Sequence, residues 1–250
     1  MGSSKRISSD HPVRKLFTAL ACLEPYPPGV IAVPKQILGT SFFPGGTGLW
    51  CEGSSEVPHF PVGGVMVLGH DFHNIAGYEW SLLNVAENLD SPTWKQLRAL
   101  LARVPIPLES CFFTNIYMGL REGDATTGRF PGSRCPEFKT RCQRFFIRQI
   151  QVQRPRVILA LGKWVPGFLA SLSPQLSAWT QFRTLRAIDT AGLPLILGVS
   201  FKGVSDHECA VVSLVHPCFR PSNIHRRTWK DLRGDAVELK MLQQAMSLND

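Results

Sequence analysis

The chain contains a run of four apolar residues that ends on a glycine and leads directly into a polar cluster. Val65-Met-Val-Leu68 is followed by Gly69, and then by His70-Asp71-Phe72-His73-Asn74. A short unbroken apolar run is typical of a strand that is buried on both faces of a sheet. Ligands of open α/β sheets bind beyond the carboxyl ends of the strands. The run therefore predicts an α/β fold with a site in the cluster, unless the polar residues only complete a turn.

Segments of the same two kinds alternate along the rest of the chain. Further apolar runs are typical of buried strands, and one long segment has an apolar stripe at helical spacings of three and four residues. This alternation favours a three-layer α/β/α sandwich with a central, largely parallel sheet. We expect strands at residues 65–69, 111–115, 157–162, 193–201 and 210–215, and helices at 11–23, 93–103 and 135–153, directly after 162, and from near 223 or 228 towards 248. Residues 78–88 form either a short helix or a loop that lines the site.

The length of 250 residues predicts a single domain that spans residues 1–250. Within it we expect an N-terminal extension and helix at 1–23, an irregular wrap at 24–64 and an α/β core at 65–250. The wrap is rich in proline and glycine, with short strands around 30–33, and long irregular segments are often functional. No signal peptide is recognisable, and no apolar run approaches the roughly 20 residues that span a bilayer. We expect a cytoplasmic monomer without a membrane partner, associated with the nucleoid if the source is bacterial.

The charge balance favours a polyanionic partner. The chain has 27 lysines and arginines against 19 aspartates and glutamates, which gives a formal net charge of +8. Nucleic acid is one such partner, although many basic proteins bind none. The seven cysteines are scattered and include no C-x-x-C pair, which indicates reduced thiols rather than a zinc ribbon.

Polar residues suited to a site follow three of the expected strands. They are the cluster after Gly69, the pair Thr114-Asn115, and the segment His216-Pro-Cys-Phe-Arg220. Together they would offer a carboxylate, an amide and an imidazole at one edge of the sheet. Each alone could be structural, but three in this order indicate a functional site.

These motifs resemble the uracil-DNA glycosylase superfamily over about 65–227. The first cluster is similar to the motif G-Q-D-P-Y-H, Phe113-Thr-Asn115-Ile to the strand whose asparagine reads the base, and His216-Pro217-Cys218 to the motif H-P-S. Residues 135–163 are similar to the C-P…A-L-G unit of the iron-sulfur branch. The resemblance implies a monofunctional glycosylase that acts on single- or double-stranded DNA. No lysine of a covalent lyase lies in the three clusters.

As an N-glycosidic bond is hydrolysed, cationic charge develops on the sugar and anionic charge on the departing base. Asp71 is suited to stabilise the first and to activate a water, and His216 to donate to the base. Asn115 can pair with a pyrimidine, because an amide both donates and accepts. An extruded base also needs an aromatic face. Phe72, Tyr78 and Trp80 are the candidates, with core packing as the competing interpretation.

The residues that follow His216 are candidates for DNA contact. Phe219 occupies the place where the superfamily carries the residue that wedges into the duplex. Four basic residues could hold phosphates, although a solvated helix start explains the last three almost as well; they are Arg220, Arg226, Arg227 and Lys230.

Two departures from the superfamily pattern are informative. His73 replaces the tyrosine that excludes thymine, so a substituent at the pyrimidine 5 position would be tolerated or read by hydrogen bonds from His73. This favours a modified base, such as a hypermodified phage base, and hence antiviral defence; the alternative is an ordinary uracil-DNA glycosylase in base-excision repair. Of the four cysteines that hold the cluster in the iron-sulfur branch, only one has a counterpart here, Cys135. We therefore expect no iron-sulfur cluster and no other cofactor.

Two further interpretations stay open. His70, Asp71 and His73 could be ligands of a metal-dependent hydrolase, because imidazole and carboxylate suit zinc or manganese. Alternatively, the chain is a nucleic-acid-binding protein that has the fold without the chemistry. The joint presence of Asp71, Asn115 and His216 favours the enzyme.

Overall fold

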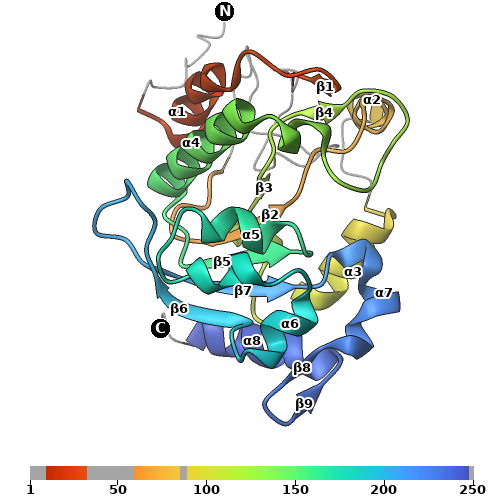
Figure 1. The fold of residues 1–250 in the computed structure, drawn as a ribbon, viewed down its shortest axis with the longest axis vertical. Coiled ribbons are helices and arrows are strands. Elements are labelled where there is room, and N and C mark those ends of the chain that lie inside the picture. The colour runs from red at the N-terminus through yellow and green to blue at the C-terminus, as the bar shows by residue number, and fades with distance from the viewer. Residues whose placement is uncertain (1–9, 33–58, 85–88, 248–250) are drawn as a thin grey trace, which may run out of the picture. The chain divides into compact units, whose positions relative to one another are not determined.

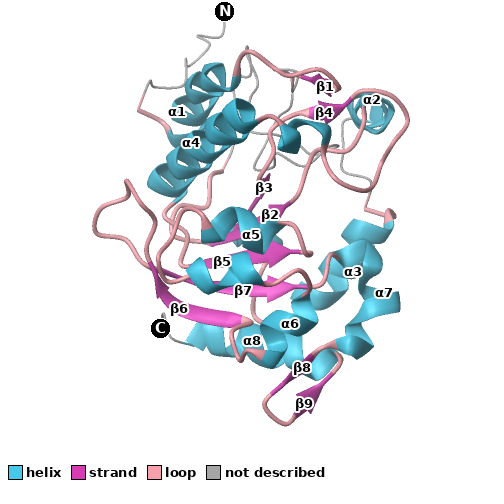
Figure 2. Cartoon of the chain, in the orientation of Figure 1, coloured by secondary structure: helices cyan, strands magenta, loops and turns pink. Residues whose placement is uncertain are grey.

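The computed structural model describes residues 10–32, 59–84 and 89–247. Its centre is a five-stranded, mostly parallel sheet in the order β3-β2-β5-β7-β6, flanked by helices (Figures 1 and 2). The strands are β2 (Val65–Gly69), β3 (Cys111–Asn115), β5 (Val157–Leu161), β6 (Leu195–Val199) and β7 (Cys209–Leu214). β5 pairs in parallel with both β2 and β7, whereas β6 runs antiparallel to β7. The arrangement confirms the α/β class and is consistent with three layers.

The strand cores are as apolar as the sequence predicts. Every residue of β2, β3, β5 and β7 is buried. β6 lies at the edge of the sheet and exposes its middle residues. Burial of β2 and β5 along their whole length is what an unbroken apolar run requires of a strand inside a parallel sheet.

The chain divides into two compact units, each assembled from segments that are far apart in the sequence. The first comprises residues 1–62, 71–88 and 112–154, and the second comprises residues 63–70, 89–111 and 155–250. No sequence feature predicted this division. The chain passes between the units at residue 71, directly after β2, so the polar cluster is shared: His70 belongs to the second unit and Asp71–Asn74 to the first.

The first unit is built around one long helix. Its elements are α1 (Pro12–Ala19), η1 (Leu20–Leu23), β1 (Val30–Ile31), α2 (Ile75–Asn84), β4 (Leu120–Arg121), η3 (Pro131–Arg134) and α4 (Pro136–Gln153). The predicted stripe of α4 is buried, and the helix ends at Arg154, whose left-handed φ of 47° precedes Pro155. Arg141 of this helix donates from its Nε to the Leu23 carbonyl. β1 pairs with β4, which confirms the strand expected near residue 30, whereas 33–58 of the expected wrap lie outside the described residues.

The second unit holds most of the sheet and the C-terminal part of the chain. Its helices are α3 (Pro92–Leu101), η2 (Leu108–Ser110), α5 (Val165–Ala170), η4 (Ser177–Gln181), α6 (Leu185–Thr190), η5 (Pro217–Phe219), α7 (Arg220–Asn223), η6 (Ile224–Arg226) and α8 (Asp235–Ser247). α3 begins one residue before the expected start, with Pro92 in its first turn and the Ser91 hydroxyl accepting from the Trp94 N–H.

The start of the last helix differs from the prediction. A hairpin of β8 (Thr228–Trp229) and β9 (Leu232–Arg233) occupies the segment expected to be helical, and α8 begins only at Asp235. Lys230 has a φ of 52°, a left-handed conformation that a right-handed helix cannot contain. A left-handed residue at this position therefore excludes a continuous helix and forms the turn between β8 and β9.

Two simpler expectations can be compared with the described residues. No helix in residues 10–32, 59–84 or 89–247 is both long and apolar enough to cross a membrane. The six cysteines within these ranges form no disulfide.

Candidate functional site

Asp71 is held by a buried ion pair in the first unit. Arg121 Nε lies 3.0 Å from Asp71 Oδ1, and a terminal guanidinium nitrogen lies 2.7 Å from Oδ2. The two side chains are only 3% and 9% exposed. The remaining guanidinium N–H groups donate to the carbonyls of Thr127, Gly128 and Arg129. Arg121 therefore holds both the carboxylate and the backbone of residues 127–129.

His73 has an unusual backbone conformation that its neighbours maintain. Its φ is 76°, a region that non-glycine residues rarely adopt and that costs of order 1–3 kcal/mol. Its N–H donates to Asp71 Oδ1 at 3.1 Å, and its carbonyl accepts from the Arg121 N–H at 2.7 Å. Both members of the Asp71–Arg121 ion pair therefore hold the backbone of His73 in this conformation.

The imidazole of His73 is positioned by the start of α2. Nδ1 lies 2.9 Å from Asn74 Oδ1, which also accepts from the Gly77 N–H at 3.1 Å. A Cβ atom at Gly77 would lie 2.6 Å from Nδ1, so any other residue there would displace the ring. His73 remains partly exposed in this position.

The candidates for base recognition in the first unit differ in accessibility. Asn115 ends β3 and is 3% exposed. Phe72 and Tyr78 are 0% and 1% exposed, so they are core residues, and the expectation that either presents a stacking face is corrected. Burial raises the pKa of Tyr78 to about 12, which is consistent with a core position. Trp80 is 44% exposed and is the remaining candidate.

In the second unit, the parallel strands bring His70, Gly162 and His216 to one edge of the sheet. Leu68 pairs with Ala160 and Leu161 with Leu214, so the residues that follow these strands share an edge. Gly162 has a φ of 81°, and a Cβ there would lie 3.0 Å from the Cβ of His216. The Gly162 of the A-L-G segment, which is a packing motif, thus makes room for the candidate catalytic imidazole.

His216 is oriented by a cysteine two residues away. Its Nδ1 lies 3.1 Å from Cys218 Sγ. Burial raises the pKa of the Cys218 thiol, so the sulfur stays protonated and can donate to Nδ1. With the thiol as donor, the imidazole hydrogen would reside on Nε2, the tautomer needed to donate a hydrogen bond to a leaving group.

Exposed aromatic side chains flank this edge. Phe219 is 48% exposed, and its ring centroid lies 5.9 Å from that of His216. Trp164 is 41% exposed and stacks on His70 with a centroid distance of 5.7 Å. Sequence reasoning missed Trp164, although an aromatic residue two positions after a strand-ending glycine is a usable signal.

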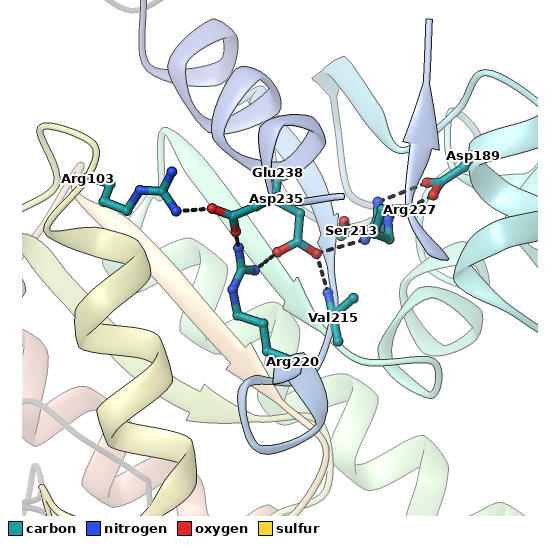
Figure 3. Close-up of polar contacts among 8 residues, drawn as sticks. All are labelled: Arg103, Asp189, Ser213, Val215, Arg220, Arg227, Asp235 and Glu238. Carbon is teal, nitrogen blue, oxygen red and sulfur yellow. Dashed lines mark hydrogen bonds and ion pairs between the residues drawn. The ribbon is translucent and has the colours of Figure 1, made fainter. Parts of the chain in front are cut away.

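Two of the four expected phosphate-binding residues are buried in ion pairs, which corrects that prediction. Arg220 donates to Asp235 and Glu238, and Arg227 to Asp189 and Glu238 (Figure 3). The two arginines are 6% and 1% exposed. Their guanidinium groups neutralise carboxylates inside the unit and are therefore not presented to a polyanion. Of the four residues, Arg226 and Lys230 are exposed.

The same cluster positions the segment that contains His216. Glu238 Oε1 accepts from the Val215 N–H at 2.6 Å, directly before His216, while Oε2 accepts from Arg220 beyond it (Figure 3). Arg103, two residues beyond the end of α3, joins through Asp235. Sequence reasoning missed Glu238, Asp235 and Asp189, since nothing local to these residues signals their partners.

The described residues do not support the metal-hydrolase alternative. Within 10–32, 59–84 and 89–247, no three histidine, cysteine or acidic side chains are grouped so that they could hold a metal ion. Asp71 is engaged by Arg121, and Nδ1 of His73 by Asn74.

Comparison of the sequence with known protein families and curated proteins identifies no relative. The chain matches no protein-family profile, and no curated protein sequence is significantly similar to it.

Proposed function

We propose that this protein is a monofunctional DNA glycosylase that hydrolyses the N-glycosidic bond of an extruded pyrimidine and leaves an abasic site. The observation that carries the proposal is the position of the three polar clusters. Asp71–Asn74 begin two residues after β2, Asn115 is the last residue of β3, and His216 lies two residues after β7. The chain resembles the uracil-DNA glycosylase superfamily, whose motifs carry their functional residues at these places. We propose that the chain also has the fold of that superfamily.

The proposed roles follow the charges that develop in the reaction. His216 donates from Nε2 to the departing base, whose negative charge grows as the bond breaks. Asn115 pairs with the edge of the pyrimidine. The 71–74 segment serves the sugar and the attacking water. Phe219, Arg226 and Lys230 are exposed and contact the DNA, since accessible aromatic and basic side chains favour such contact.

The substrate we propose is a pyrimidine with a modified or bulky 5-substituent. His73 stands where the resembling motif has a larger tyrosine, which leaves more room beside the 5 position. Hypermodified phage DNA is rich in such bases, which makes antiviral defence the proposed role, with repair of uracil as the alternative.

The test is mass spectrometry of free bases released by the full-length chain. The substrates are uracil-containing DNA, DNA with thymine mismatches, and phage DNA with hypermodified cytosine, each single- and double-stranded. We expect release of the modified pyrimidine, and a loss of about 10²–10⁴-fold in rate for His216→Ala, which removes the donor. If no base is released from any of these DNAs, the proposed function is wrong.

A further inference from the structure

The hydrogen bonds around Asn74 determine which nitrogen of His73 carries the hydrogen. The Gly77 N–H can only donate, so the side-chain atom of Asn74 that it contacts at 3.1 Å must be the oxygen. The same oxygen lies 2.9 Å from His73 Nδ1. Because an amide oxygen can only accept, Nδ1 must donate to it. Neutral His73 therefore carries its hydrogen on Nδ1.

The other ring nitrogen is consequently a hydrogen-bond acceptor. In neutral imidazole the nitrogen without hydrogen has a lone pair, here Nε2. Within the described part of the chain, Nε2 of His73 makes no hydrogen bond, and the residue is partly exposed. Its orientation is fixed by Asn74, Gly77 and its own left-handed backbone. A rare conformation maintained in this way is characteristic of functional positions.

Asp71, by contrast, directs its lone pairs towards its partners. Oδ1 accepts from Arg121 Nε and from the His73 N–H, and Oδ2 accepts from the guanidinium of Arg121. A carboxylate has about four acceptor positions, so most of them are occupied. The Asp71 carboxylate is thus arranged to hold His73 and Arg121 rather than to bind a water.

We propose that His73 Nε2, and not Asp71, is the proton acceptor for the attacking water. This inference rests on the proposed glycosylase function. The water oxygen bonds to C1′ of the sugar, the bond from C1′ to the base nitrogen breaks, and its electron pair leaves with the base. The water proton passes to Nε2, and the resulting imidazolium keeps its Nδ1–H bond to Asn74. The proton then passes to solvent, from which the departed base anion is protonated. Asp71 and Asn74 are positioning residues.

The first experiment measures single-turnover base release by the His73→Gln variant. The substrates are the DNAs from which the wild type releases a base. Glutamine can form a hydrogen bond but cannot take up a proton, so we expect release to fall about 10²–10⁴-fold. A proton acceptor acts on water, so the factor should be the same for uracil and for a 5-substituted pyrimidine. A loss confined to the substituted base would show that His73 reads the substituent, and an unchanged rate would show that it has no role; either result overturns the inference.

The second experiment reads the tautomer directly, without substrate. Side-chain ¹⁵N NMR of the full chain should show His73 with hydrogen on Nδ1. We expect Asn74→Ala to shift the hydrogen to Nε2 and to slow release, whereas Asn74→Asp should keep both the tautomer and most of the rate. Wild-type hydrogen on Nε2 would overturn the inference. If the wild type releases no base while the Nδ1 hydrogen is observed, the glycosylase proposal fails and the tautomer assignment stands.

Discussion

Replacement of Arg227 by methionine should remove a large part of the stability of the second unit. Its guanidinium lies 2.8 and 2.9 Å from the oxygens of Asp189, and 3.0 Å from both Glu238 Oε1 and the Ser213 carbonyl. In the Arg227→Met variant Glu238 keeps Arg220, whereas Asp189 loses its guanidinium partner and keeps the Thr228 N–H. A buried charge without its partner costs about 3–5 kcal/mol. At roughly 2–4 °C per kcal/mol, Tm should fall by roughly 6–20 °C.

The cost should depend on pH with a definite sign. Burial raises the pKa of Asp189 above its ordinary value, and Arg227 opposes this rise. Without Arg227 the pKa of Asp189 in the folded state should rise further. A carboxyl with a raised folded pKa binds its proton more tightly when folded, so stability falls as pH increases through that pKa. The difference in free energy of unfolding between variant and wild type should be largest at neutral pH. It should shrink as pH falls towards the ordinary pKa of an aspartate.

Urea unfolding followed by circular dichroism at neutral and acidic pH measures this difference. Arg226→Met is the matched control, because it removes the same charge from the adjacent, exposed position. We expect that control to stay within about 0.5 kcal/mol of wild type. Equal stabilities for the two variants, or a deficit of Arg227→Met that grows in acid, would refute the reasoning.

Three further predictions concern the site. Gly162→Ala should slow base release more than tenfold in the single-turnover assay, because its Cβ would lie 3.0 Å from the Cβ of His216. The control Gly167→Ala has open space around its Cβ and should keep the wild-type rate, so equal rates for the two variants would contradict this prediction. Cys218→Ser should keep most of the release rate by donating to the same ring nitrogen, and Cys218→Ala should lose several-fold, which the same assay measures. Arg226→Met and Lys230→Met should each lower the slope of DNA affinity against salt by about 1, measured by fluorescence anisotropy; an unchanged slope would place both outside the DNA interface.

The sequence was sufficient for the sheet because its signals are local. The unbroken apolar run of β2 and the three–four stripe of α4 each specify a period and a burial pattern within a few residues. The hairpin of β8 and β9 was missed because two-residue strands are too short to show a period, and its turn depends on a left-handed Lys230 rather than on a glycine.

The partners of the site residues could not be predicted, because they depend on contacts between distant segments. Asp71 and Arg121 are fifty residues apart, and no local pattern distinguishes Arg121 from the other basic residues. In the same way, Arg226 and Arg227 are neighbours in sequence, yet one is exposed and the other is 1% exposed. Burial, which only the fold determines, decides which of the two can meet a phosphate.

The buried arginines also affect how the protein meets a polyanion at a distance. Arg121, Arg220 and Arg227 are buried with as many buried carboxylates, those of Asp71, Asp189 and Glu238. These opposite charges cancel, so the formal excess of +8 belongs to the other ionisable groups of the chain. Such an excess in contact with water speeds encounter with DNA and is attenuated by added salt over about 10 Å at 0.1 M. Capture of DNA should therefore respond to ionic strength, while the internal pairs that maintain the geometry should be nearly indifferent to it.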